Sequence, residues 1–237
     1  MTKRWIVTGG SRGLGLALAR WVVARGDRVA VTARSIDETY LKAELGAGCL
    51  AIAADVTSPE SVRVAFDRVA AAWGGIDVLI NNAGLHRGGR VDKLDLADWD
   101  AVLDTNLSGP LHCVRAVLPH MPKGGSIVNI GAVVGFSGFP GDSPYGASKA
   151  GLAGLTKVLA VELARQEIRV NLVVPGLVRT EMTQDLSGRA MEQITKRIPL
   201  RRLGNDDEVA EVIGWVAGST YMTGAVIPTD GGLSCTL

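Results

Sequence analysis

Residues 5–15 read Trp5-Ile6-Val7-Thr8-Gly9-Gly10-Ser11-Arg12-Gly13-Leu14-Gly15, a short apolar run that leads into a glycine-rich turn. The apolar residues that follow stand at helical spacing, at Leu14, Leu18, Trp21 and Val22. A strand, a glycine turn and an amphipathic helix in this order are typical of the first unit of a parallel α/β sheet.

A glycine-rich turn between a strand and a helix lets the backbone approach a pyrophosphate. The N-terminus of the helix adds unpaired N–H groups and the positive end of its dipole. An ordinary tight turn also needs glycine. The place of this turn, in the first unit of an alternating chain, favours a dinucleotide site.

Strand and helix patterns alternate along all 237 residues. The alternation predicts one domain, 1–237, with a doubly wound parallel sheet of the Rossmann type, seven strands and helices on both faces. The expected strands are 5–8, 28–33, 49–53, 76–81, 125–130, 169–174 and 225–228. The expected helices are 13–25, 36–45, 59–72, 97–118, 145–165 and 206–217. The hydrophobic content of 47% suits a sheet that is covered on both faces.

Composition argues against several classes of function. A net charge of +1 with no basic block speaks against nucleic-acid binding. No apolar run reaches membrane-spanning length, and the chain enters its first strand without a signal peptide. The three cysteines, Cys49, Cys113 and Cys235, lack the spacing of metal ligands, so we expect reduced thiols in a cytoplasmic protein and no metal site.

Tyr145 and Lys149 stand four apart in the run Tyr145-Gly146-Ala147-Ser148-Lys149. On a helix such residues share one face, and a neighbouring ammonium lowers the pKa of a phenol from about 10 toward neutrality. A tyrosine of this kind transfers a proton to or from a substrate oxygen. The same spacing is common in solvated surface pairs, so the catalytic interpretation depends on the glycine turn as well.

The chain resembles the short-chain dehydrogenase/reductase family over essentially its whole length. The motifs that carry the resemblance lie in the family's order and spacing: Gly9-x3-Gly13-x-Gly15, Asn81-Asn82-Ala83-Gly84, Asn106, Tyr145 with Lys149, and Pro175-Gly176. Residues 130–135 and 199–204 are most similar to the 3-oxoacyl-acyl-carrier-protein reductases and related ketoreductases. The resemblance implies reduction of a 3-oxoacyl thioester or similar keto group, a lid at 180–199, and a homotetramer through the last strand.

The residue after the second expected strand bears on the cofactor. NAD enzymes usually place an acid there for the ribose 2′-OH, but Ala33 is followed by Arg34. Together with Arg12, Arg34 would hold the 2′-phosphate of NADPH, and Ser11 and Ser35 would add hydroxyl donors. The alternative is that both arginines are ordinary surface residues.

The resemblance assigns the rest of the cofactor site. Asp55 and the Val56 backbone would bind adenine, Asn81–Gly84 would lie beside the adenosine ribose, and Val178 with Thr180 would hold the carboxamide. Asn81 and Asn82 are interpreted equally well as turn residues. The expected cofactor-binding residues are Gly9, Ser11, Arg12, Gly13, Leu14, Gly15, Arg34, Ser35, Asp55, Val56, Asn82, Ala83, Gly84, Tyr145, Lys149, Pro175, Gly176, Val178 and Thr180.

The resemblance also assigns the proton chemistry. Tyr145 would protonate the alkoxide, Lys149 would lower the tyrosine's pKa and hold the ribose, and Asn106 would kink its helix and place a water. The serine that orients substrate in the family maps to Ala132. Losing one such donor typically costs about 10²–10³ in turnover. Ser137 and Ser143 are the nearby hydroxyls, but neither stands at the position of the family's serine, so we do not expect either to compensate.

Two explanations of Ala132 stay open: a deliberate serine-to-alanine replacement, which we favour, or a natural departure toward a different substrate. A second function also stays open, a non-catalytic NADPH-binding member of the same fold. Carrier-protein binding is undecided as well. Lys123 occupies one position where a basic residue is expected, but Gln166 occupies the other.

Overall fold

The computed structural model describes residues 2–178, 192 and 195–235. One parallel sheet holds all seven strands in the order β3-β2-β1-β4-β5-β6-β7. The order reverses between β1 and β4, which is where an open α/β sheet binds its ligand. The predicted fold class is confirmed. The strands are β1 (Arg4–Thr8), β2 (Arg28–Ala33), β3 (Leu50–Ala53), β4 (Val78–Asn81), β5 (Ser126–Ile130), β6 (Arg169–Pro175) and β7 (Val226–Thr229).

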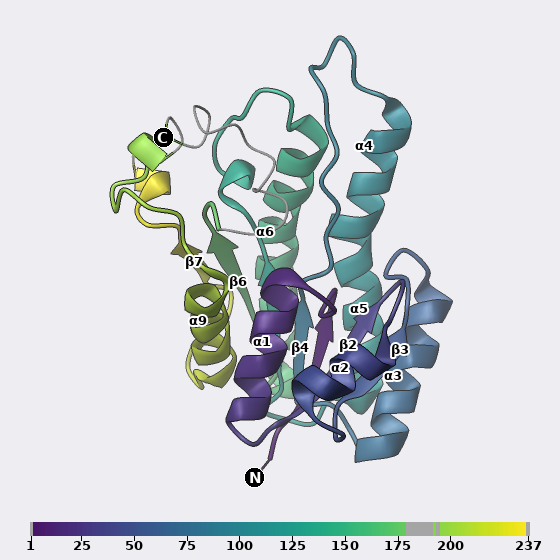
Figure 1. Cartoon of the computed structure of the whole chain (residues 1–237). Coiled ribbons are helices and arrows are strands. Elements are labelled where there is room, and N and C mark those ends of the chain that lie inside the picture. Colours follow the sequence, from purple (N-terminus) through teal and green to yellow (C-terminus); the bar gives the residue numbers. More distant parts are fainter. Residues whose placement is uncertain (1, 179–191, 193–194, 236–237) are drawn as a thin grey trace.

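Helices cover both faces of the sheet (Figure 1). The helices α1, α2 and α9 contribute to one core cluster, and α3, α5 and α6 contribute to the other. Their bounds are α1 (Gly13–Ala24), α2 (Glu38–Leu45), α3 (Pro59–Trp73), α4 (Leu96–Leu103), α5 (Gly109–Val117), α6 (Ser143–Leu163) and α9 (Asp206–Gly218).

The central strands are apolar on both faces because each face is covered. In β1, Trp5 and Val7 belong to the cluster with α1 and α9, whereas Ile6 belongs to the cluster with α3 and α5. Successive side chains of a strand point to opposite faces, so a strand buried on both sides has no polar alternation. The continuous apolar run at the start of the chain follows from this position.

The expected helix 97–118 is interrupted. The chain forms α4, then a π-helical turn (Asp104–Ser108) around the buried Asn106, then α5. Asparagine is a poor residue for a helix interior, and π turns often occur at functional sites. The irregularity expected at Asn106 is therefore present, although the prediction of one continuous helix is wrong.

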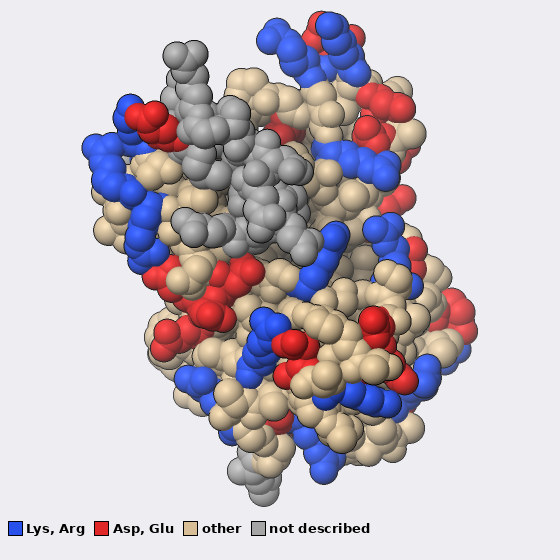
Figure 2. All heavy atoms as spheres, in the orientation of Figure 1, with Lys and Arg blue, Asp and Glu red and all other residues tan. Residues whose placement is uncertain are grey.

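The described residues show no sign of a membrane, metal or disulfide site. None of their helices is long and apolar enough to cross a membrane, and no group of their side chains is suited to hold a metal ion. All three cysteines are free. Figure 2 shows acidic and basic side chains interspersed over one face, so that face offers no extended basic track for nucleic acid.

Candidate active site

The turn between β1 and α1 is built as its glycines predict. Gly9 and Gly13 have positive φ angles of 64° and 51°. At Gly15 a Cβ would lie 2.5 Å from both the Asn82 side chain and the Gly9 carbonyl oxygen, so no side chain fits there. The N-terminus of α1 has no side-chain cap and no acid in its first turn, which leaves its N–H groups suited to an anion.

The end of β4 holds this turn in place. Asn82 Nδ2 donates to the carbonyl oxygens of Thr8 at 3.0 Å and Gly9 at 3.1 Å. The Thr8 hydroxyl accepts from the backbone N–H groups of Asn82 and Ala83, at 3.0 Å each. Asn81 is buried and donates to Asn129 Oδ1 at 2.8 Å. In this protein the two asparagines join strand ends, which agrees with their interpretation as structural residues.

The residues expected to bind the adenosine half lie at the carboxyl ends of β1, β2 and β3. Arg12 and Arg34 are both exposed, as are Ser35 and Gly13. One carboxylate oxygen of Asp55 accepts from the N–H and hydroxyl of Thr57, which forms a local turn. The edge of the sheet therefore presents two guanidinium groups and no acid directly after β2.

The nicotinamide side of the expected site is described in part. Gly176 donates its N–H to the Thr229 carbonyl oxygen at 3.0 Å, and a Cβ there would lie 2.6 Å from the Asp230 backbone. Val178 forms an isolated bridge with Gly204. Thr180, like most of the expected lid, lies outside the described residues.

Tyr145 and Lys149 lie on α6, one turn apart. The Lys149 ammonium is 5.5 Å from the centroid of the Tyr145 ring and donates to the Ile130 carbonyl oxygen at 2.8 Å. Lys149 is buried, and this desolvation lowers its pKa to about 8. The two side chains therefore meet on one helix face, as their spacing predicts.

The pKa of Tyr145 moves opposite to the sequence-based expectation. Burial of the phenol raises its pKa to about 12, and the negative charge of Asp142 adds to the rise. Lys149 directs its ammonium to a backbone oxygen of β5, and its burial favours the neutral amine. Without bound ligand the phenol is thus held protonated, the form that donates a proton.

Asn106 connects three parts of the site. Its Nδ2 donates to the Leu85 carbonyl oxygen at 2.9 Å and to the Ser148 hydroxyl at 3.2 Å. Its Oδ1 accepts from the Leu85 N–H at 2.8 Å. Both amide hydrogens are used, so the side chain fixes the loop after β4 against α6 and has no donor left for a water.

Ala132 follows β5 in extended backbone (φ −163°) and precedes a short 3-10 turn, Val133–Gly135. It has no hydroxyl to face the tyrosine. Ser143 stands two residues before Tyr145 in α6 and is exposed, and residues two apart on a helix do not face the same way. Ser143 is therefore poorly placed to compensate.

Two more side chains border Tyr145. The His86 ring stands edge-on to the Tyr145 ring, with centroids 4.9 Å apart and planes at 83°. His86 Nε2 lies 3.0 Å from Asp142 Oδ1. The motifs single out neither residue as catalytic. The only local signal is that His86 follows the Asn81–Gly84 motif and Asp142 precedes Tyr145 closely.

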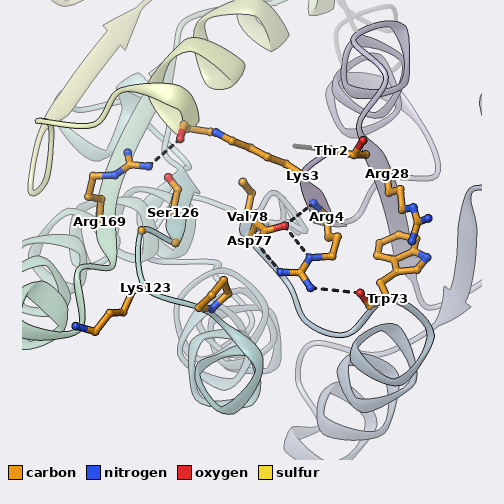
Figure 3. A pocket seen from close by; sticks show the side chains of 14 residues that line it. Thr2, Lys3, Arg4, Arg28, Trp73, Asp77, Val78, Lys123, Ser126 and Arg169 are labelled. Atoms are coloured by element: carbon orange, nitrogen blue, oxygen red, sulfur yellow. Dashed lines mark hydrogen bonds and ion pairs between the residues drawn. The ribbon is translucent and has the colours of Figure 1, made fainter.

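A separate pocket of about 760 Å³ lies at the amino ends of the strands, the opposite edge of the sheet (Figure 3). Arg4 pairs with Asp77 across it at 2.7 Å, and Arg169 donates to carbonyl oxygens at the end of α9. These charged groups have structural partners, and none lies near Tyr145 in the fold. We therefore do not place the reaction there.

Known proteins resemble this chain over its whole length. A family model described as "Enoyl-(Acyl carrier protein) reductase" matches residues 9–234. The human 3-oxoacyl-[acyl-carrier-protein] reductase is 41% identical over 240 residues, which cover 100% of both chains. The corresponding protein of Thermotoga maritima is 40% identical, with 96% of each chain covered.

The chain belongs to the short-chain dehydrogenase/reductase family. A solved short-chain dehydrogenase/reductase from Serratia marcescens superposes with a TM-score of 0.93, at 33% identity and 98% coverage of both chains. A blue fluorescent protein from a metagenomic library, solved in complex with NADPH, gives a TM-score of 0.92 at 34% identity, over 98% of this chain and 97% of that one. These matches confirm the family that the motifs predicted.

Proposed function

We propose that this protein is an NADPH-dependent ketoreductase that reduces a 3-oxoacyl thioester or a similar keto group to a hydroxyl. The observation that carries the proposal is the half-buried Tyr145 one helical turn from the buried Lys149, at the same end of the sheet as the glycine turn. The full-length relatives named as 3-oxoacyl-[acyl-carrier-protein] reductases support the same chemistry.

The residues at the glycine turn fit NADPH. The uncapped N-terminus of α1 suits the pyrophosphate, and no acid directly follows β2 to bind a free ribose 2′-OH. Arg12 and Arg34 would hold the 2′-phosphate through charge-assisted bonds. Bound NADPH supplies the hydride. The other expected contacts, those of Ser11, Ser35, Asp55, Val56, Pro175, Gly176, Val178 and Thr180, remain part of the proposal.

Tyr145 supplies the proton that the reduced substrate oxygen needs. Its raised pKa keeps the phenol protonated over the physiological range, so the acid is present for reduction, while the reverse oxidation would need the disfavoured phenolate. Lys149 would hold the nicotinamide ribose from its buried position. We propose that Ala132, whatever its origin, lowers turnover relative to a serine at this position.

A β-keto thioester assay tests the proposal. NADPH consumption is followed with a panel of such thioesters for the parent and for Ala132→Ser, and consumption by either protein supports a reductase. NADPH binding without turnover in both proteins would favour the alternative, a non-catalytic NADPH-binding member of the fold. The observation that supports this alternative is the absence of a hydroxyl at Ala132.

The proposal includes a carrier protein as substrate partner, a homotetramer and a cytoplasmic location. Lys123 pairs with Glu167 at 3.0 Å and lies at the amino ends of the strands, away from Tyr145, so this lysine by itself does not support carrier-protein binding. The free cysteines fit a reducing compartment. The edge strand β7 is the expected interface, and Tyr221, fully exposed just before it, is the natural residue to test.

Light scattering tests the tetramer. We expect four copies in the parent and fewer in Tyr221→Asp. Tyr40→Asp, at an exposed tyrosine on α2, is the matched control and should leave the assembly unchanged. A monodisperse parent monomer rules the tetramer out.

A further inference from the structure

His86 and Asp142 form a hydrogen-bonded pair against the ring of the proposed acid, Tyr145. The loop after β4 carries His86, and Asp142 stands at the N-terminal cap of α6. The pair and the phenol therefore come from two segments that the fold brings together.

The backbone next to His86 is fixed. Leu85, the preceding residue, exchanges two hydrogen bonds with the buried Asn106, which also binds Ser148 on α6. A site residue held by packed neighbours keeps its geometry better than one on a free loop. His86 is thus a fixed group beside Tyr145, although its side chain is 41% exposed and open to a ligand.

The two ring nitrogens of His86 have different surroundings. Asp142 occupies Nε2. Among the described residues, none forms a hydrogen bond with Nδ1. A neutral ring that donates from Nε2 has only an acceptor at Nδ1, whereas the imidazolium carries a proton on both nitrogens. Only the doubly protonated ring can therefore donate from Nδ1 while Nε2 donates to Asp142.

We propose that His86 is a catalytic residue whose imidazolium, held by Asp142, donates an Nδ1–H hydrogen bond to the substrate carbonyl oxygen. This is the contact that Ala132 cannot make. The inference rests on the proposed ketone reduction and names a further residue of that same site.

The step balances without any further reactant. A hydride supplied by NADPH, which would be oxidised to NADP+, adds to the carbonyl carbon, and the C=O π pair moves to the oxygen. The oxygen takes the proton of Tyr145, and water returns a proton to the phenolate that is left. His86 stabilises the developing charge and keeps its own proton. Among the residues that the structure describes, the ionisable groups around the phenol are His86, Asp142 and Lys149. The Asp142 charge also raises the pKa of Tyr145 and so keeps the acid protonated.

The test is a set of variants in two backgrounds. His86→Phe keeps a flat ring without a donor, and His86→Gln keeps an N–H donor without the ring. Each is made alone and together with Ala132→Ser, and kcat and KM are measured with NADPH and a β-keto thioester. Arg87→Gln, at the neighbouring residue that pairs with Asp98 on the surface, is the control.

We expect His86→Phe alone to lower kcat by about 10²-fold. In the Ala132→Ser background, His86→Phe should lower kcat by less than about threefold relative to Ala132→Ser alone, because the serine hydroxyl then supplies the donor. His86→Gln should keep most of the parent's kcat, and Arg87→Gln all of it. Melting temperature and NADPH binding should stay at the parent's values, which separates a lost donor from a lost fold.

Equal losses in both backgrounds overturn the inference, because a structural role does not depend on residue 132. A parent with no measurable turnover beside an active Ala132→Ser also overturns it, since His86 would then not compensate, while the proposed function would stand. If neither protein reduces a ketone, both the proposed function and the inference fail.

Discussion

The Lys149 ammonium donates a 2.8 Å hydrogen bond to the carbonyl oxygen of Ile130, the last residue of β5. No carboxylate among the described residues pairs with this buried cation. Burial without a counter-ion explains why the pKa of Lys149 lies at about 8. The buried cation therefore destabilises the folded protein, which is common for charged groups that contact a ligand.

This cost predicts a pH dependence. The pKa of Lys149 is lowered from 10.5 to about 8, so between these values the unfolded chain binds more protons than the folded one. Stability therefore rises with pH across that window, by up to about 3 kcal/mol relative to Lys149→Met, which cannot titrate. Urea unfolding of both proteins at several pH values measures the difference. Parallel stability curves would contradict the assignment.

Serine at position 132 should restore a donor to the substrate oxygen. In a His86→Phe background, Ala132→Ser should raise turnover by about 10²–10³, and by less where His86 is present. Tyr145→Phe should abolish reduction in every background, because the proton donor is lost while the ring packing remains. Single-turnover assays with NADPH measure the effects of Ala132→Ser and of Tyr145→Phe. Reduction that persists in Tyr145→Phe would show that the tyrosine is not the proton donor.

Cofactor choice should depend on Arg34. Arg34→Ala should weaken the binding of NADPH by about 1.5–3 kcal/mol, which is the contribution of a charge-assisted hydrogen bond. The affinity for NADH should stay nearly unchanged. Titration of both cofactors by fluorescence measures the two affinities. The exposed Arg68 on α3 supplies a control, Arg68→Ala, with no expected effect on either. Equal losses of NADPH and NADH would show that the 2′-phosphate is bound elsewhere.

The packing of α9 on α1 should depend on Gly214. A Cβ at this position would lie 2.1 Å from the Trp21 ring, which belongs to the core between the two helices. Gly214→Ala should therefore destabilise the protein by about 1–3 kcal/mol. Gly218→Ala, at the end of the same helix with nothing within 4 Å, should be neutral or stabilising by up to about 1 kcal/mol. Thermal unfolding distinguishes them, and equal melting temperatures would count against the packing argument.

Local patterns determined the fold and the geometry of the glycine turn. Strand and helix periods depend on residues close in sequence, so the seven strands and the α6 pair Tyr145 and Lys149 were predictable with boundary errors of one or two residues. The glycines of the first turn were predictable for the same reason: positive φ and close backbone approach exclude other residues.

Tertiary structure alone decided the environment of the acid. The spacing of Tyr145 and Lys149 predicts a lowered tyrosine pKa, but burial and Asp142 raise it. The hydrogen bonds of Asn106 to Leu85 and Ser148 and the contact of His86 with Tyr145 join segments that are distant in the chain. Desolvation and charge act through space, and which groups meet is set by how the loop after β4 packs against α6. The sequence thus determined the family and the residues of the proposed acid pair, and packing decided in which direction the pKa of each member moves.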